Sequence, residues 1–296
     1  MEPPKPSRNE GLIGWLPLVV LPLSALALYN LLQPWAFMWI LAASIYCGLK
    51  WLTWFKGRGR VPHAAWRSIA YLVAWPGMDA DSFLDARKVA APPRLRDWLH
   101  AVLETGLGVI LLWAVARILP QGQTLLRGWI GMLGLILLLH FGSFQILALV
   151  WQRFAVTATP IMSAPLRSGS LSEFWGKRWN LGFRQLSYDL IFAPLHRRLG
   201  ATLTTLLVFV VSGLIHDLVI SVPARGDYGF PTAYFTLQGV GVAFERSRSG
   251  ERLGLGSGVR GWLFMAVVTA GPVFWLFHPP FVMHVIIPFM KAIHAL

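Results

Sequence analysis

The recurrence of long apolar runs constrains this chain more than any other feature. Several of these runs approach the roughly 20 residues that a helix needs to cross the hydrocarbon core of a bilayer. Lipid offers a backbone no hydrogen-bonding partner, so only helices and closed β-barrels span membranes. The short alternating segments typical of barrel strands are missing from the sequence. The pattern therefore predicts an all-α, polytopic integral membrane protein.

About eight segments are long and apolar enough to be predicted as transmembrane helices. They cover residues 12–32, 35–55, 99–117, 128–151, 202–222, 232–244, 262–277 and 281–293. We expect residues 61–75 to form an amphipathic or partly inserted helix that ends at a Pro-Gly turn. The aromatic-rich polar interval 152–199 is expected to fold into short interfacial or re-entrant helices. Together these segments predict a single membrane-embedded domain over residues 1–296.

The net charge of +13 could indicate either nucleic-acid binding or membrane topology. The basic residues cluster in short loops between apolar runs, as the positive-inside rule predicts. No polar domain large enough to bind nucleic acid is visible, which favours topology. Of the 26 Lys and Arg residues, only Arg117, Arg127 and Arg225 fall on the side opposite the rest. We therefore expect both termini in the cytoplasm and no nucleic-acid partner.

The first apolar run lacks a small-residue cleavage site, so it is predicted to be a retained helix rather than a signal peptide. The chain is compact and has no long polar tails, which favours a bacterial inner membrane. Membrane lipids are its expected surroundings, and the oligomeric state stays open.

The sequence gives no reason to expect a bound metal. Cys47 is the only cysteine, so neither a disulfide within the chain nor a cysteine-based metal site is predicted. Asp79 and Asp81 stand two residues apart after a Pro-Gly turn, without further ligands nearby in sequence. One of these two carboxylates is expected to cap a helix N-terminus.

An ionisable residue, His216, lies within the apolar run VFVVSGLIHDLVI. One interpretation is a structural histidine that bonds Ser212 or a neighbouring helix. The other is a general base, because a neutral imidazole can accept a hydroxyl proton near neutral pH. Asp217 points about 100° away from His216 on the same helix. It is therefore expected either to pack against a neighbouring helix or to contact residues of the site from outside its centre.

A polar segment, SLSEFWGKRWN at residues 170–180, precedes the run that carries His216. It could be an interfacial anchor, since aromatic and basic side chains gather at membrane surfaces. The Asn180 amide fits that role less well, because it offers both a donor and an acceptor for a substrate. Basic side chains here could also attract the phosphates of an anionic substrate. Trp175, Lys177, Arg178 and Trp179 would suit the anchor, whereas Lys177, Arg178 and Arg184 are the candidates for binding the phosphates.

A second histidine, His140, lies in the apolar stretch LLLHFGSF. Polar residues within membrane segments tend to face an interior cavity. We expect His140 to form a wall of a reaction chamber rather than to catalyse.

Four blocks together resemble the wax-synthase-like branch of the membrane-bound O-acyltransferase (MBOAT) family over roughly residues 75–245. They read WPGMDADSF, LHFGSF, SLSEFWGKRWN and SGLIHDLVISVPARGDYGFPTAYFTLQG. The resemblance implies an MBOAT-like fold with a catalytic core over residues 140–245. His216 matches the family's catalytic histidine, and Asn180 matches the asparagine of its FWxxRWN-type block. Plant members commonly have Glu where this chain has Asp217.

The resemblance also implies the reaction, which is transfer of an acyl group from acyl-CoA to the hydroxyl of a lipophilic alcohol within the membrane. Acyl-CoA is then the donor substrate, and no permanently bound cofactor is expected. The alternative is a multi-span transporter or flippase that uses the intramembrane histidine as a proton relay. Transporters commonly show inverted repeats or paired broken helices, and neither is visible in this sequence.

Overall fold

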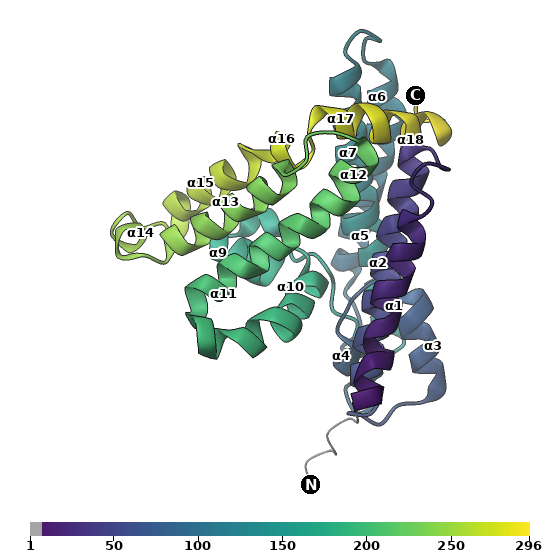
Figure 1. The fold of residues 1–296 in the computed structure, drawn as a ribbon, viewed down its shortest axis with the longest axis vertical. Helices are drawn as coiled ribbons and strands as arrows, with labels where there is room; N and C mark the ends of the chain where they lie inside the picture. Colours follow the sequence, from purple (N-terminus) through teal and green to yellow (C-terminus); the bar gives the residue numbers. More distant parts are fainter. Residues whose placement is uncertain (1–7) are drawn as a thin grey trace. The chain divides into compact units, whose positions relative to one another are not determined.

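The computed structural model describes residues 8–296, and side chains from residue 11 onward. Within that range the chain is helical and contains no strand (Figure 1). It forms two compact units. The first unit holds residues up to Leu112 together with Leu133–Pro160, and the second holds Trp113–Met132 and Ile161–Leu296. The all-α class is confirmed, and the expectation of a single domain stays a prediction.

The first unit combines a pair of packed helices, α1 and α2, with further helices. Its helices are α1 (Arg8–Leu26), α2 (Pro34–Gly57), α3 (Ala65–Ala74), α4 (Ala80–Leu84), α5 (Leu95–Val109), the end of α7 (Thr124–Ile136) and α8 (Phe144–Arg153). α1 and α2 pack closely at Gly48, where a Cβ atom would lie only 2.5 Å from the Leu18 Cα atom. Small residues at such a position let two membrane helices approach each other.

The predicted amphipathic helix is α3, which ends before Trp75. The block that follows it turns into α4, where the Asp79 carboxylate accepts the Ser82 N–H at 2.9 Å. The expected N-cap is therefore confirmed. Asp81 instead forms an ion pair with Arg60 at 3.1 Å. The buried side chains of Tyr71, Trp75 and Phe83 form the centre of this unit's core.

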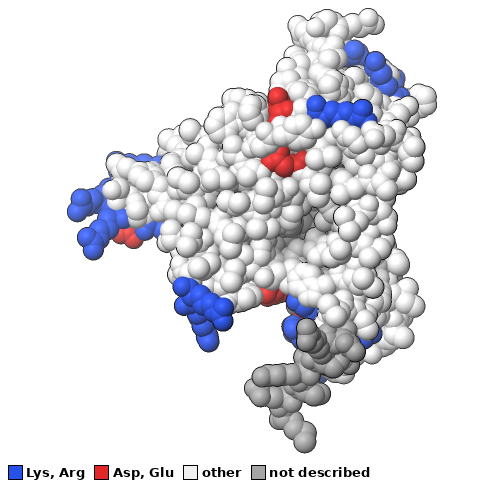
Figure 2. All heavy atoms as spheres, in the orientation of Figure 1, with Lys and Arg blue, Asp and Glu red and all other residues white. Residues whose placement is uncertain are grey.

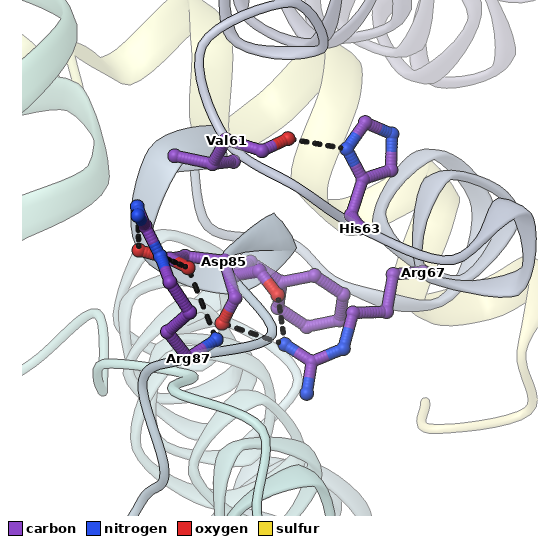
Figure 3. A network of polar contacts seen from close by, with 6 residues as sticks. Val61, His63, Arg67, Asp85 and Arg87 are labelled. Carbon is purple, nitrogen blue, oxygen red and sulfur yellow. Dashed lines mark hydrogen bonds and ion pairs between the residues drawn. The ribbon is translucent and has the colours of Figure 1, made fainter.

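A network of polar contacts fixes the segment after α4 against α3 (Figure 3). The buried Arg67 guanidinium donates to the backbone carbonyls of Phe83 and Asp85, each at 3.1 Å. The Asp85 carboxylate in turn accepts from Arg87 at 3.0 Å. Arg67 therefore has a structural role, because its partners are backbone oxygens at the C-terminal end of α4.

The longest helices of the second unit are α11, α13 and α15, and shorter helices connect them (Figure 1). Its helices are α6 (Ala116–Ile118), the start of α7, α9 (Leu171–Glu173), α10 (Leu181–Ser187), α11 (Ala193–His216), α12 (Val222–Ala224), α13 (Phe230–Glu245), α14 (Arg248–Arg252), α15 (Gly258–Ala270), α16 (Val273–Leu276), α17 (Pro279–Phe281) and α18 (Ile287–Ala292). α11 is kinked at Gly200, whose φ of 76° suits a residue without a Cβ atom. The polar interval 152–199 is thus ordered as short helices, as expected.

Five helices in the described part of the chain are long and apolar enough to cross a membrane. They cover Pro34–Gly57, Leu95–Ile118, Thr124–Arg153, Leu181–Ala224 and Gly258–Leu276. The first predicted span contains a shorter apolar helix, Gly11–Leu26, and the span predicted at 232–244 lies within α13. The chain is therefore a polytopic membrane protein, while the number of eight spans stays a prediction.

Charged side chains occupy limited areas of the surface. On the face in Figure 2, basic side chains gather over α14, and wide areas elsewhere carry no charge. Uncharged surface of this kind suits contact with lipid tails, whereas basic loops favour the cytoplasmic membrane surface.

Candidate active site

The second unit contains a cavity of about 370 Å³ between the 170–180 segment, α10, α11 and α13. Most of its wall is aromatic or aliphatic, and a few polar groups are set into it, which is typical of small-molecule sites. Its polar and charged lining consists of Ser172, Asn180, Arg184, Ser187, Thr205, Ser212, His216 and Arg246. Its aromatic lining consists of Trp175, Trp179, Phe183, Tyr188, Phe192, Phe209 and Phe235.

His216 is the last residue of α11 and lines this cavity. Its Nδ1 atom lies 2.7 Å from the backbone oxygen of Ser212, one turn earlier. A carbonyl oxygen only accepts hydrogen bonds, so Nδ1 carries the proton in the neutral ring and Nε2 carries the lone pair. The bond to Ser212 that a structural histidine would make is present. It also fixes the tautomer that a general base requires.

Asn180 lines the same cavity and is the N-cap residue of α10. Its φ and ψ of 41° and 62° are left-handed, a conformation that asparagine tolerates better than most residues. The side-chain oxygen Oδ1 accepts the Phe183 N–H at 3.2 Å and so caps the helix. This cap fixes the orientation of the amide, and the Nδ2 group takes no part in it.

Aromatic rings connect the 170–180 segment to His216. The Trp175 ring meets Phe209 edge-on at 5.6 Å and lies 5.7 Å from Phe235, measured between ring centres. Phe235 lies 4.3 Å from the imidazole ring of His216. The two motifs singled out in the sequence therefore share one wall of packed rings.

The predicted basic residues have different environments. Arg178 forms an ion pair with Glu173 at 2.7 Å and also donates to the Ser163 carbonyl oxygen. The Gly169 N–H and Arg178 together lower the pKa of Glu173 below its ordinary value of 4.5. Neither Lys177, which is exposed, nor Arg178 lines the cavity, whereas Arg184 does.

Asp217 does not line the cavity either. Its carboxylate accepts the N–H groups of Gly229 at 2.8 Å and Thr232 at 3.0 Å, together with the hydroxyl groups of Thr232 and Ser221. Gly229 precedes α13 and has no side chain with which to cap it. Asp217, the residue after α11, supplies that cap, so it joins the end of the His216 helix to the start of α13.

His140 belongs to the first unit, in the π-helical segment Leu137–Ser143. Its ring meets Phe144 edge-on at 5.5 Å. Among the described side chains, its Nδ1 is the buried polar atom without a hydrogen-bond partner. The expectation that His140 forms a wall of the reaction chamber stays a prediction.

Several residues at the site were not predicted from the sequence. Arg246 lines the cavity, and its Nε atom donates to the Ser172 hydroxyl at 3.0 Å. Gln238 and Glu245 are buried on α13 and contact the 170–180 segment. The available signal was the presence of Gln and Glu, seven residues apart, in an otherwise apolar helix, because that spacing places both on one face.

Most of the cavity residues lie in the part of the chain that resembles a known family, and Val242 and Arg246 lie just beyond it. A model of the membrane bound O-acyl transferase family matches residues 158–237, which include Asn180 and His216. The resemblance expected from the sequence is therefore confirmed over that segment.

Individual relatives are similar over a comparable stretch. The probable long-chain-alcohol O-fatty-acyltransferase 2 of Arabidopsis thaliana is 32% identical over 138 residues, which cover 40% of this chain and 38% of the relative. The long-chain-alcohol O-fatty-acyltransferase of Simmondsia chinensis is 31% identical over 139 residues, covering 42% and 39%. The probable long-chain-alcohol O-fatty-acyltransferase 8 of Arabidopsis thaliana is 33% identical over 101 residues, covering 30% and 29%. The match thus spans less than two fifths of each relative's length.

Proposed function

We propose that this chain transfers an acyl group from acyl-CoA to the hydroxyl of a lipophilic alcohol and forms an ester within the membrane. The observation that carries the proposal is a single apolar cavity lined by both His216 and Asn180. The names of the similar plant proteins support a long-chain alcohol as the acceptor.

In this proposal His216 is the general base. Its Nδ1 proton is held by the Ser212 carbonyl, so Nε2 accepts the proton of the alcohol hydroxyl. The alcohol oxygen then attacks the thioester carbon of acyl-CoA. The carbonyl oxygen becomes negatively charged, and the Asn180 Nδ2 group donates a hydrogen bond to it.

The tetrahedral intermediate then collapses. Its C–S bond breaks, the ester carbonyl re-forms, and the CoA thiolate takes the proton from the His216 imidazolium. Trp175 and Trp179 contribute apolar wall against which the acyl chain and the alcohol pack. An apolar wall also limits the access of water, the nucleophile that would hydrolyse the thioester.

The phosphates of acyl-CoA are proposed to meet Arg184 and Arg246. Both line the cavity and are exposed, so their guanidinium groups can reach a ligand from solvent. Lys177 is exposed nearby in sequence and could add long-range attraction, whereas Arg178 is already paired with Glu173. The donor requires cytoplasmic access, so the proposal includes the basic loops and both termini lying on the cytoplasmic side, as the positive-inside rule predicts.

The test uses purified protein in liposomes supplied with a long-chain acyl-CoA and a long-chain alcohol. We expect ester and free CoA thiol to form in equal amounts, and little thiol to form without alcohol. Absence of ester would reject the proposal. Movement of a solute across the bilayer without ester formation would support the transporter alternative instead.

A further inference from the structure

One face of α13 contacts both of the motifs that line the cavity. Thr232, Phe235, Gln238 and Glu245 are separated by intervals of three and seven residues, which places them on the same side of the helix. Each of them contacts a different part of the site. α13 is therefore positioned to set the spacing between the 170–180 segment and His216.

Glu245 holds the C-terminal part of this face. Its side chain is buried, at 4% exposure, and its carboxylate accepts the backbone N–H groups of Leu171 at 2.6 Å and Ser172 at 3.1 Å. These N–H groups begin α9, where they have no partner within the helix. A buried carboxylate is tolerated only when it is paired in this way. Glu245 thus fixes the start of the segment that carries Trp175 and Asn180.

Gln238 holds the same segment two turns earlier on α13. It is fully buried, and its Oε1 atom accepts the indole N–H of Trp175 at 3.3 Å. Its amide nitrogen donates to the Val268 carbonyl oxygen at 2.8 Å, so the amide is fixed from both sides. The position of the Trp175 ring along α13 is consequently fixed by Gln238.

The first turn of α13 is fixed to the helix that carries the histidine. Asp217, the residue after His216, accepts the N–H of Thr232 at 3.0 Å, and Phe235 lies against the His216 ring. The helix rises about 20 Å between Thr232 and Glu245 at 1.5 Å per residue. Contacts at both ends of that length bring the 170–180 segment and the imidazole to the same cavity.

We propose that Glu245 is a positioning residue that places Trp175 and Asn180 relative to His216. The two N–H donors are met by the two oxygens of the carboxylate, whereas a glutamine keeps one oxygen and replaces the other with a donor. Its NH₂ group would face the second backbone N–H. The inference rests on the proposed acyl transfer, because its effect is expected in the turnover of that reaction.

The test compares Glu245→Gln with Glu251→Gln, the same chemical change at an exposed position on α14. For Glu245→Gln we expect kcat for ester formation to fall about 10- to 100-fold, as the loss of a hydrogen bond to a charged group predicts. KM for acyl-CoA should change little, because the cavity arginines remain. Hydrogen exchange of the peptide that covers residues 170–180 should become faster. The Glu251→Gln variant should resemble the wild type in all three measurements.

Faster exchange with an unchanged kcat would overturn the proposal and leave Glu245 a purely structural residue. Unchanged exchange would show that Glu245 does not fix the segment. If the wild-type protein makes no ester, the proposed function fails, and so does the catalytic part of this inference. The exchange measurement would still test whether Glu245 fixes residues 170–180.

A second variant keeps the proposal testable if Glu245→Gln folds poorly. Gln238→Met preserves side-chain length but removes the bond to Trp175, and kcat should again fall more than KM changes. Because both residues hold one segment, the double variant should lose less activity than the product of the single losses. A fully multiplicative loss would contradict a shared positioning role.

Discussion

The two units use buried polar groups in different ways. In the first unit, Lys50 is 1% exposed, donates to the Gly77 carbonyl oxygen and lies 3.2 Å from the centre of the Tyr71 ring. Arg67 likewise donates to the backbone carbonyls of Phe83, in α4, and Asp85, which follows it (Figure 3). Both side chains therefore hold the segment between α3 and Asp85 in place through backbone carbonyls.

In the second unit, His216 and Asn180 each use one side-chain atom for the fold. The imidazole Nδ1 bonds to Ser212, and the amide Oδ1 caps α10, yet both residues also line a cavity. Burial of a polar residue in a membrane protein is therefore weak evidence of function by itself. A stronger indication is a fixed orientation together with a second polar atom beside a cavity.

The largest expected effect is that of His216→Ala. Loss of a general base lowers the rate about 10²–10⁴-fold, while the helix is kept because alanine favours it. Ester formation by purified protein in liposomes measures the effect. The matched control is His100→Ala, which removes an exposed histidine from α5 and should leave the rate unchanged. A His216→Ala variant as active as the wild type would show that His216, like Lys50 and Arg67, serves only the fold.

Asn180→Asp separates the cap from the proposed donor. Aspartate keeps an oxygen for the Phe183 N–H but has no NH₂ group, and its negative charge opposes an oxyanion. We expect the thermal unfolding midpoint to stay close to that of the wild type and kcat to fall about 10²–10³-fold. Asn180→Gly is the companion variant, because it tolerates the left-handed backbone but loses both the cap and the donor. Equal activity of wild type and Asn180→Asp would show that Asn180 serves the fold alone.

Lys50→Met should lower the stability of the protein and leave its activity unchanged. The Gly77 carbonyl oxygen loses its partner, which is expected to lower the free energy of unfolding by about 1–3 kcal/mol. The kcat of the folded protein should not change. Thermal unfolding in detergent, combined with the ester assay, measures both quantities. A more stable variant would mean that burying the lysine side chain costs more free energy than its contacts contribute.

The smallest expected effect is the pH dependence that arises from Glu173. Its folded pKa lies below the ordinary 4.5 because of the Gly169 N–H and Arg178. Its stabilisation is therefore complete above pH 4.5 and is lost as the pH falls through the folded pKa. The unfolding midpoints of the wild type and Glu173→Gln should differ at pH 6 and converge in acid. A difference that persists below that range would assign the effect to another group.

The sequence predicted the features that depend on local patterns. Apolar length gave the helical membrane class, the Pro-Gly turn gave the end of α3, and Asp79 was expected to be a cap. His216 and Asn180 stood out because polar side chains are rare in or beside apolar runs. Each of these signals is contained in a few consecutive residues, so it can be recognised from the sequence alone.

Tertiary structure decided which of these residues meet and what each of them bonds. Glu245 caps a turn 74 residues earlier in the chain, and Arg178 is paired with Glu173 rather than directed to the cavity. Asp217 closes the first turn of α13. Side-chain periodicity shows which face of a helix is polar but not which distant backbone groups that face will meet. Those partners are set by how the helices pack, and that packing placed the histidine and the asparagine beside the same cavity.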